Sequence, residues 1–269
     1  MMHRALADRV VLVTGASGIA AAGARLFAAS GAPVFVVSRT SEKCASLADE
    51  ITASGGVVEW AQADLTVESE SDAAARACLE RFGRIDGLFA VAGGSGRRFG
   101  DGPVDEMDLA GWEATLKLNG HPAFLAARNA VRVMRRQEPN ESGTRGSIVL
   151  VTSVLAASPV PAHFATHAYA AVKGAEVSLT TTMASYYAPA LIRVNAIAPG
   201  LIRTPMAERA AEDPVISGYA ARKQPIAGGL LEPGEVASAG AFLLGDTSRH
   251  ITGQVLAVDG GWSVTEASA

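Results

Sequence analysis

The stretch Val10-Val11-Leu12-Val13-Thr14-Gly15-Ala16-Ser17-Gly18-Ile19-Ala20 decides the fold, because it passes from an apolar run into a helical pattern through a turn of small residues. An apolar run of this kind is typical of a strand buried on both faces of a parallel sheet. A turn without bulky side chains lets main-chain N–H groups and a helix N-terminus approach a phosphate closely. The stretch therefore predicts the first strand, the turn and the first helix of a nucleotide-binding α/β fold.

The remainder of the chain continues this alternation of strand and helix. Further strands are predicted at residues 34–38, 57–61, 87–91, 147–152, 193–198 and 254–258, after a first strand at 10–14. Helices are predicted near 19–30, 41–54, 68–82, 108–137, 167–188 and 233–244. Apolar strands joined by crossover helices favour a parallel sheet with helices on both faces. We predict an α/β protein, a single-domain Rossmann-like doubly wound parallel sheet of about seven strands, spanning residues 1–269.

The composition excludes several classes of protein. The chain has 269 residues, of which 49% are hydrophobic and 19% charged, and its formal net charge is −4. It can bury a sizeable core, and it lacks the basic field that favours nucleic acid. No apolar run is long enough to span a bilayer, and residues 1–9 lack the apolar core of a signal peptide. Cys44 and Cys78 lack metal-ligand spacing and indicate free thiols in a reducing compartment. We expect a cytoplasmic protein with no metal, no membrane and no nucleic acid as partner.

Tyr169-Ala-Ala-Val-Lys173 has the spacing of a proton-transfer pair. A tyrosine and a lysine four residues apart lie on the same face of a helix. The phenol of free tyrosine titrates near pH ~10, and lowering its pKa by roughly 3 units requires about 4 kcal/mol. An ammonium about 4 Å away supplies roughly this energy at an effective dielectric constant near 20. Tyr169 is therefore predicted to act as an acid–base group with a lowered pKa.

A second copy of the pattern, Tyr219-Ala-Ala-Arg-Lys223, has a different context. It lies between Pro214 and Pro225 in a segment rich in helix breakers, and no strand precedes it closely. The first copy opens a long helical run and follows a strand that ends at Thr152-Ser153. We assign the chemistry to Tyr169 and a place on the protein surface to Tyr219.

The end of the second strand indicates which dinucleotide would bind. In such folds an acidic residue near this position binds a ribose 2′-hydroxyl, whereas an arginine accommodates a 2′-phosphate. Here the strand ends Ser38-Arg39-Thr40, without a carboxylate. This favours NADP(H) over NAD(H). Asp64 closes the third strand and is predicted to meet the adenine edge, with helix capping as the alternative role.

Several motifs in order now identify a family. With the glycine turn, Ser153, Tyr169 and Lys173 in this order, the chain resembles the short-chain dehydrogenase/reductase family over nearly its whole length, and its pattern is nearest to 3-oxoacyl reductase-like members. The resemblance also rests on these stretches: Trp112 to Asn119, Asn195-Ala196-Ile197-Ala198-Pro199-Gly200, Thr252-Gly253-Gln254 and Val258-Asp259-Gly260-Gly261.

The resemblance implies a role for each catalytic residue. Tyr169 exchanges a proton with the substrate oxygen, Lys173 assists it and binds the nicotinamide ribose, and Ser153 holds the substrate oxygen. Asn119 holds a water that feeds protons to the lysine. Pro122 cannot donate to the carbonyl of Leu118, which would leave an acceptor for such a water; the alternative is that Pro122 merely bends the helix.

The turn, the strand ends and the resemblance together give a set of cofactor contacts. The predicted positions are Gly15, Ser17, Gly18, Ile19, Ser38, Arg39, Thr40, Asp64, Leu65, Ala92, Gly93, Tyr169, Lys173, Pro199, Gly200, Ile202 and Thr204. Three departures from the family pattern accompany them. The glycine turn is one residue shorter and ends in Ala20, Val91 stands where the family often has asparagine, and Ser153 is farther from Tyr169 than is usual. We expect the shorter turn to weaken or alter cofactor binding.

The predicted function is that of an NADP(H)-dependent oxidoreductase that interconverts a ketone or aldehyde and an alcohol. The alternatives are an NAD-dependent alcohol, steroid or sugar dehydrogenase and a non-catalytic sensor of the nicotinamide cofactor. Residues 94–103, 156–167 and a lid at about 200–229 around Met206 are expected to contact a largely apolar small substrate. Arg97 and Arg98 offer a binding site for an acidic substrate, the alternative being two solvated side chains. The resemblance also implies a homo-tetramer or homodimer, with residues 123–134 and 174–188 as candidate contacts.

Overall fold

The computed structural model describes residues 6–266 and contains one seven-stranded parallel sheet. Residues 1–5, part of the N-terminal stretch considered above, lie outside the described residues. The strand order is β3-β2-β1-β4-β5-β6-β7. Strands β2 and β3 are added on one side of β1 and strands β4 to β7 on the other side, so the order of the chain switches sides between β1 and β4. The strands are β1 (Val11–Thr14), β2 (Val34–Ser38), β3 (Val58–Gln62), β4 (Gly87–Ala90), β5 (Gly146–Val151), β6 (Ile192–Pro199) and β7 (Val255–Val258). The predicted doubly wound Rossmann-like sheet is confirmed.

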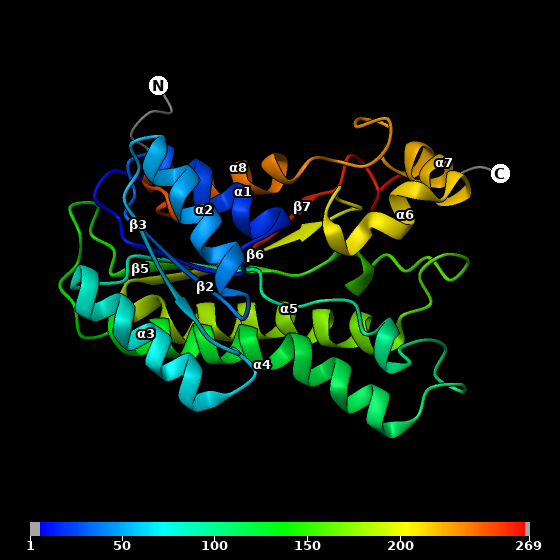
Figure 1. Ribbon diagram of the computed structural model, residues 1–269, viewed down its shortest axis with the longest axis horizontal. Helices are drawn as coiled ribbons and strands as arrows, with labels where there is room; N and C mark the ends of the chain where they lie inside the picture. The colour runs from blue at the N-terminus through cyan, green and yellow to red at the C-terminus, as the bar shows by residue number, and fades with distance from the viewer. Residues whose placement is uncertain (1–5, 267–269) are drawn as a thin grey trace.

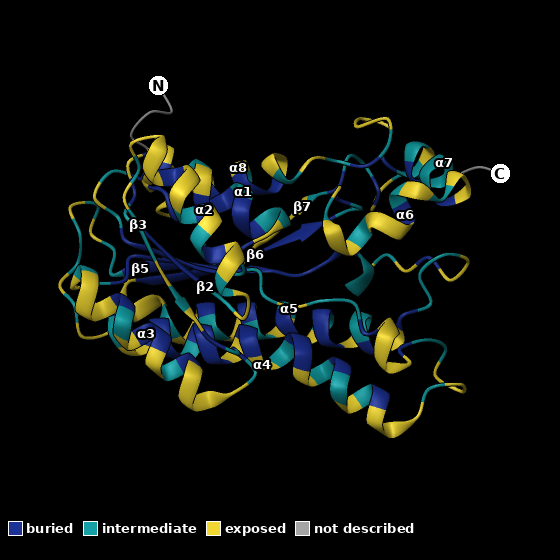
Figure 2. Ribbon diagram, viewed as in Figure 1, coloured by how far each residue is buried: buried dark blue, intermediate teal, exposed yellow. Residues whose placement is uncertain are grey.

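Helices cover both faces of this sheet (Figure 1). One layer consists of α1 (Gly18–Ala29), α2 (Ser41–Ala53) and α8 (Pro233–Leu244). The other layer consists of α3 (Glu68–Phe82), α4 (Leu109–Met134) and α5 (His167–Tyr187). Residues of β1, β2, β4, β5 and β6 are almost all buried, whereas the outward faces of the helices are exposed (Figure 2). Burial of the central strands on both faces explains their uninterrupted apolar sequences.

The side chain of Phe89 on β4 sets how closely α1 and α8 pack against the sheet. Its fully buried ring packs edge-to-face on Phe27 of α1, with the ring centroids 5.2 Å apart. Gly23 of α1 and Gly240 of α8 make room for it, since a Cβ at either position would lie 2.8 Å from the ring. The two glycines thus let α1 and α8 close around one aromatic side chain.

No helix was predicted in the segment at 200–229, but the structure has three there. It contains the short helix η4 (Pro205–Ala207), α6 (Glu208–Glu212) and α7 (Pro214–Lys223). The carboxylate of Asp213 accepts hydrogen bonds from the N–H groups of Val215 and Ile216, and Pro214 occupies the first turn of α7. Asp213-Pro214 therefore starts a helix rather than breaking one. The remaining short helices are η1 (Arg97–Phe99), η2 (Val154–Ala156), η3 (Ala188–Ala190) and η5 (Asp246–Ser248).

Within residues 6–266, no helix combines the length and the apolar character needed to cross a membrane. The same part of the chain has no cluster of three or more His, Cys, Asp or Glu side chains that could hold a metal ion.

Candidate active site

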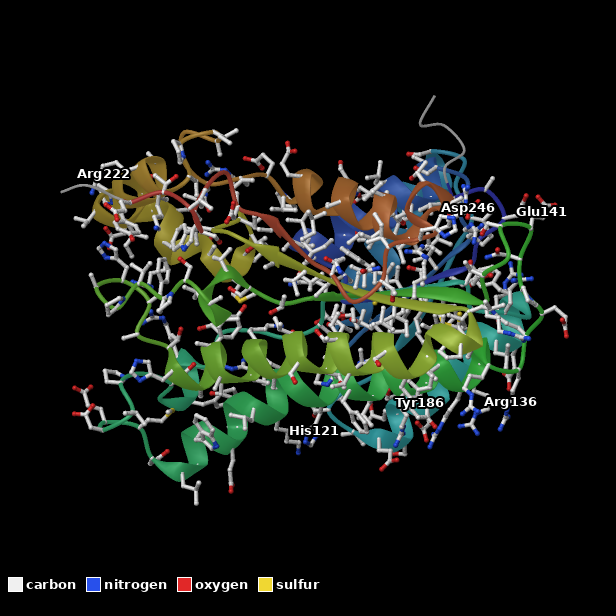
Figure 3. The ribbon with its side chains drawn as sticks, turned by 180° about the vertical axis from the view of Figure 1, so that it is seen from behind. His121, Arg136, Glu141, Tyr186, Arg222 and Asp246 are labelled. Carbon is white, nitrogen blue, oxygen red and sulfur yellow. The ribbon has the colours of Figure 1, made fainter. Side chains whose placement is uncertain are left out.

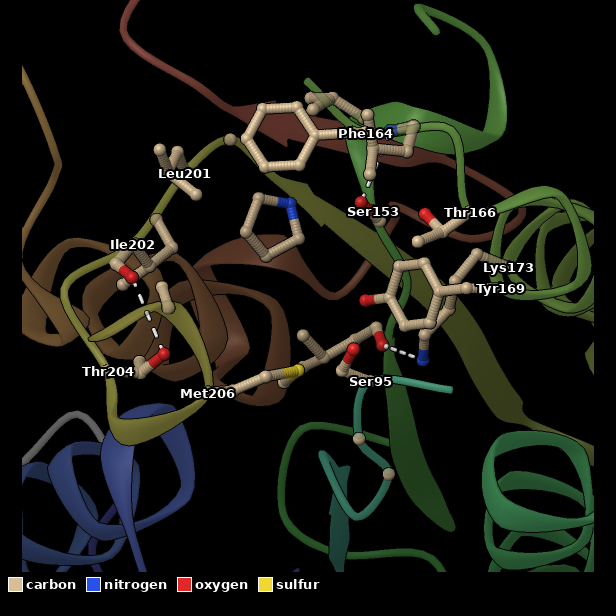
Figure 4. A pocket seen from close by; sticks show the side chains of 18 of the residues that line it. Ser95, Ser153, Phe164, Thr166, Tyr169, Lys173, Leu201, Ile202, Thr204 and Met206 are labelled. Carbon is tan, nitrogen blue, oxygen red and sulfur yellow. Dashed lines mark hydrogen bonds between the residues drawn. The ribbon is translucent and has the colours of Figure 1, made fainter. Parts of the chain in front are cut away.

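A cavity of about 190 Å³ opens at the carboxyl ends of the central strands. Its walls come from the residues that follow β4, β5 and β6 and from the first turns of α5, as expected for a ligand site in an open α/β sheet. Much of its lining is apolar, with Leu155, Phe164, Leu201, Met206 and Trp262 contributing side chains. In Figure 4 the phenol oxygen of Tyr169 points into this cavity.

The structure brings the four predicted catalytic residues to this cavity. Asn119 of α4, Ser153 after β5, and Tyr169 and Lys173 of α5 all line it. Six predicted cofactor contacts also line it, namely Ile19, Gly93, Pro199, Gly200, Ile202 and Thr204. The others lie outside its walls, at or after the ends of β1, β2, β3 and β4: Gly15, Ser17, Gly18, Ser38, Arg39, Thr40, Asp64, Leu65 and Ala92. Of these, Leu65 has its side chain buried in the core, so that only its main chain is suited to a ligand.

Lys173 is held by a buried carboxylate that the sequence analysis did not consider. Its ammonium lies 2.9 Å from both carboxylate oxygens of Glu176 and 3.0 Å from the carbonyl oxygen of Val151. Both side chains of the pair are almost completely buried, with exposed fractions of 6% and 4%. An ammonium has three N–H donors, and here three protein oxygens accept from it. The lysine is therefore part of a neutral ion pair and not an isolated cation.

Burial, together with this pairing, reverses the predicted lowering of the Tyr169 pKa. Burial raises the pKa of the Tyr169 phenol, the positive charge of Lys173 lowers it, and the negative charge of Glu176 raises it again. A hydrogen bond with the Ser153 hydroxyl favours the phenolate, yet the net pKa is raised. For Lys173 burial lowers the pKa, but the charge of Glu176, the charge of Tyr169 and the hydrogen bond to Glu176 together raise it above the ordinary value. The predicted lowering is wrong because it left out burial, which is the largest influence on the pKa of Tyr169, and the opposing charge of Glu176.

Asp101 positions the helix that carries Tyr169 and Lys173. Its buried carboxylate accepts hydrogen bonds from the main-chain N–H groups of Ala168 (3.0 Å) and Tyr169 (3.1 Å) in the first turn of α5. A carboxylate at a helix N-terminus satisfies free donors and complements the helix dipole. The loop at 94–103, predicted only to contact substrate, thus also anchors the helix that carries Tyr169 and Lys173.

Asn119 and Thr14 hold the chain after β4. The Asn119 amide donates to the carbonyls of Gly94 (3.1 Å) and Thr115 (3.0 Å), and its oxygen accepts from the N–H of Gly94 at 3.0 Å. The Thr14 hydroxyl accepts from the N–H groups of Val91 (2.9 Å) and Ala92 (3.0 Å). Thr14 therefore supplies the support that valine at 91 cannot give.

Gln224 anchors the segment that follows β6. Its fully buried amide donates to the carbonyls of Leu201 (3.2 Å) and Gly229 (2.6 Å), and its oxygen accepts from the N–H of Leu201 at 2.6 Å. A Cβ at Gly200 would lie 2.1 Å from this oxygen, so a side chain there would displace the anchor. The sequence offered no local pattern from which to find Gln224.

The glycine turn leaves main-chain N–H groups free for an anion despite its short length. Gly15 and Gly18 adopt positive φ angles of 103° and 53°. Ser17 begins α1 without a side-chain capping bond, which leaves the first-turn N–H groups available to an anion. Ala20 is fully buried, and a Cβ at Gly15 would lie 3.0 Å from its methyl group. Ala20 therefore packs beside Gly15 within the turn.

Arg39 and Asp64 lie together where the adenosine end of a dinucleotide would bind. The guanidinium of Arg39 is 4.0 Å from the carboxylate of Asp64, which accepts a hydrogen bond from the N–H of Thr66 at 2.9 Å. Burial opposes ionisation of Asp64, but Thr66, Arg39 and Lys117 hold its pKa below the usual range. Helix α3 begins after Val67, so the alternative in which Asp64 caps that helix is wrong.

Tyr219 does not lie freely on the surface, contrary to prediction. Its ring is partly buried and packs edge-on against His163 and Trp262, with centroid distances of 4.7 Å and 5.9 Å. Trp262 is fully buried and lines the cavity. The second Tyr-x-x-x-Lys copy is therefore part of an aromatic cluster behind the substrate side of the site.

Comparison with known proteins agrees with this architecture. The family model described as "Enoyl-(Acyl carrier protein) reductase" matches residues 13–263. The chain is 36% identical to cis-4-hydroxycyclohexanecarboxylate dehydrogenase of Sinomonas cyclohexanicum, covering 97% of this chain and 99% of that protein. It is 37% identical to the A-factor type gamma-butyrolactone 1'-reductase (1S-forming) of Streptomyces virginiae, covering 96% and 97%.

A solved short-chain type dehydrogenase/reductase from Mycobacterium ulcerans superposes with a TM-score of 0.88 at 33% identity, covering 97% of this chain and 92% of that one. The match extends over the whole sheet and both helix layers. The chain therefore belongs to the short-chain dehydrogenase/reductase family of oxidoreductases, which act on alcohol and ketone substrates with a nicotinamide cofactor.

Proposed function

We propose that the protein is an NADP(H)-dependent oxidoreductase that interconverts a ketone or aldehyde and an alcohol, with Tyr169 as the acid–base group. The observation that carries this proposal is the meeting of Asn119, Ser153, Tyr169 and Lys173 at one cavity beside the glycine turn. The resemblance to 3-oxoacyl reductases in particular stays a prediction. We infer a single domain over residues 1–269.

The residues of this chain have separate tasks in the proposed reaction. When bound, the cofactor supplies or accepts the hydride at the carbonyl carbon. Ser153 donates a hydrogen bond to the substrate oxygen, and Tyr169 gives that oxygen a proton in reduction or removes one in oxidation. Lys173 would bind the ribose hydroxyls by giving up one of its bonds to Glu176, and Asn119 holds the main chain around Gly94 beside the site. Apolar side chains exclude water from the reacting atoms.

The proposed preference for NADP(H) rests on Arg39. Its side chain is about half exposed, and β2 ends without a carboxylate to occupy the ribose. A charge-assisted hydrogen bond contributes about 1.5–3 kcal/mol, which corresponds to roughly 10–100-fold in affinity. Arg39→Gln is expected to weaken NADPH binding by this factor and to leave NADH binding unchanged, as measured by cofactor fluorescence.

Arg25→Gln is the matched control, because Arg25 pairs with Glu50 on an exposed surface away from the strand ends. Equal or tighter binding of NADH by the unaltered protein would contradict the NADP(H) proposal and favour an NAD-dependent alcohol, steroid or sugar dehydrogenase. Binding of either cofactor without reduction of any carbonyl compound in a broad panel would favour the non-catalytic sensor.

We further propose that the preferred substrate is a largely apolar carbonyl compound with a carboxylate. Arg97 of η1 and Arg209 of α6 both line the cavity, and no Asp or Glu of residues 6–266 does. Partial burial and the positive charge of Arg209 lower the pKa of Arg97, while Asp101 acts in the opposite sense. Two guanidinium groups that repel each other at a cavity mouth favour an anionic ligand. The relative from Sinomonas cyclohexanicum is named for a hydroxylated ring carboxylate, which supports this class.

Arg209→Gln tests this preference with two probes, 4-oxocyclohexanecarboxylate and its methyl ester. We expect KM for the acid to rise by roughly tenfold or more and KM for the ester to stay unchanged, because the ester carries no charge. Arg98→Gln is the control, since the Arg98 guanidinium stacks on Phe99 at 4.6 Å and does not line the cavity. Equal KM values for acid and ester in the unaltered protein would overturn the carboxylate proposal but not the oxidoreductase.

The proposed assembly is a homo-tetramer or homodimer in the cytoplasm. Phe124 of α4 and Tyr186 of α5 are exposed on the outer face of their helix layer, and Tyr186 and Arg136 project away from the sheet in Figure 3. Val255 and Leu256 are exposed on the edge strand β7. These apolar faces support contacts between copies of the chain. Buried free thiols at Cys44 and Cys78 suit a reducing compartment.

A further inference from the structure

The buried face of helix α5 carries charged residues as well as apolar ones. Its buried residues include Lys173, Glu176 and Thr180, on successive turns facing the sheet. A buried ion pair is a weak source of stability, because desolvation of the two charges offsets much of their attraction. Hydrophobic residues would serve packing at least as well, so the position of Glu176 beside the catalytic lysine calls for a role other than packing.

We propose that Glu176 is a positioning residue that holds the Lys173 ammonium against the Val151 carbonyl and offsets part of its positive charge beside the Tyr169 hydroxyl. This inference rests on the proposed function. It implies that Tyr169 is ready to donate a proton for carbonyl reduction at neutral pH. Alcohol oxidation, which needs the phenolate as base, should gain rate as the pH rises.

Geometry and charge both support this role. Glu176 provides two of the three oxygens that accept from the ammonium, each at 2.9 Å, so the lysine has no spare donor unless a carboxylate bond is given up. Burial raises the pKa of Tyr169, and Glu176 opposes the lowering by Lys173. Burial also raises the pKa of Glu176 itself, while Lys173 lowers it.

The other charged groups near the site come from different elements. Arg97 of η1 and Arg209 of α6 lie at the cavity, and the Asp101 carboxylate lies at the N-terminus of α5. Ser153, after β5, is the uncharged group that hydrogen-bonds the phenol, and α4 contributes the neutral Asn119. Among these groups, Lys173 and Glu176 supply the charges that act on the pKa of Tyr169.

Glu176→Gln tests the proposal because it keeps the shape and removes the charge. We expect the midpoint of the pH profile of kcat/KM for alcohol oxidation to fall by about one unit, which raises the oxidation rate at neutral pH by about tenfold. The sign follows from the phenolate, which is stabilised when a nearby negative charge is removed. Glu176→Asp, which retains the charge, should move the midpoint back toward that of the unaltered enzyme.

Thr180→Val is the matched control, since Thr180 is buried one turn further along α5 and its hydroxyl bonds the Glu176 carbonyl. It perturbs packing without changing charge, and its midpoint should not move. A uniform loss of rate in Glu176→Gln with an unchanged midpoint would show a merely structural role and overturn the proposal.

A second measurement is independent of turnover and of how well the Glu176 variants fold. Ultraviolet difference titration of the unaltered protein against Tyr169→Phe reports the ionisation of Tyr169 alone. We expect it above the ordinary value of about 10. Ionisation near neutral pH would overturn the role of Glu176. Absence of any carbonyl or alcohol turnover would instead defeat the proposed function, and the titration would still test whether Tyr169 stays protonated at neutral pH.

Discussion

Tyr169→Phe is expected to lower kcat for carbonyl reduction by roughly 10²–10⁴-fold, the usual contribution of a positioned acid–base group. Phenylalanine keeps the ring that packs at the wall of the cavity and removes only the hydroxyl that is proposed to donate the proton. Cofactor affinity and thermal stability should therefore change little. Steady-state kinetics with NADPH, together with cofactor fluorescence and a thermal melt, measure the three quantities separately.

The chain contains its own control for this experiment. Tyr219 has the same spacing to Lys223, but its ring packs in the cluster with His163 and Trp262. Tyr219→Phe keeps this packing and removes only a hydroxyl that has no part in the proposed proton transfer, so kcat should stay within about twofold. Undiminished reduction by the folded Tyr169→Phe protein would remove Tyr169 from the proposed mechanism.

Phe89→Ala is expected to lower the free energy of unfolding by about 3–5 kcal/mol. The ring is fully buried between α1 and α8, and Gly23 and Gly240 have no side chains with which to fill the space that it leaves. Both helices would have to shift to close the cavity, and α1 carries the glycine turn. Urea denaturation followed by circular dichroism gives the value.

Phe99→Ala serves as the comparison, because Phe99 is 37% exposed and stacks only on the neighbouring Arg98. A loss below about 1 kcal/mol is expected for it. Similar losses for Phe89→Ala and Phe99→Ala would mean that the layer between α1 and α8 repacks without the aromatic ring.

The sheet could be predicted from sequence because its signals are local. Buried strands are short apolar runs between breakers, and helices such as α3 and α8 begin and end where the amphipathic pattern does. The same local reading failed at α7, where Asp213-Pro214 was taken for a break although it provides a cap and a first turn. Proline can mark either the first turn of a helix or a break in the chain, so its presence alone does not tell the two apart.

The candidate site was predictable only in part, for a different reason. The spacing of Tyr169 and Lys173 is visible in the sequence, but a lysine and a glutamate three residues apart usually form a solvated surface pair. Only the rotation of α5 against the sheet buries Glu176. Asp101 acts on residues 67 and 68 positions later, and no local pattern records such a contact.

The bond between Asp101 and the start of α5 constrains how this protein can change its substrate. The loop that would meet the substrate and the helix that carries the acid–base residue share one carboxylate. Insertions in the loop that displace Asp101 would break its bonds to the first turn of α5, and the Tyr169 phenol would then shift. Under the proposed function, changes near Arg97, upstream of this carboxylate, would alter substrate contacts while leaving the bonds of Asp101 in place. The Asp101 carboxylate thus links the position of the loop to the position of the Tyr169 phenol, although under the proposed function Asp101 neither binds the substrate nor transfers a proton.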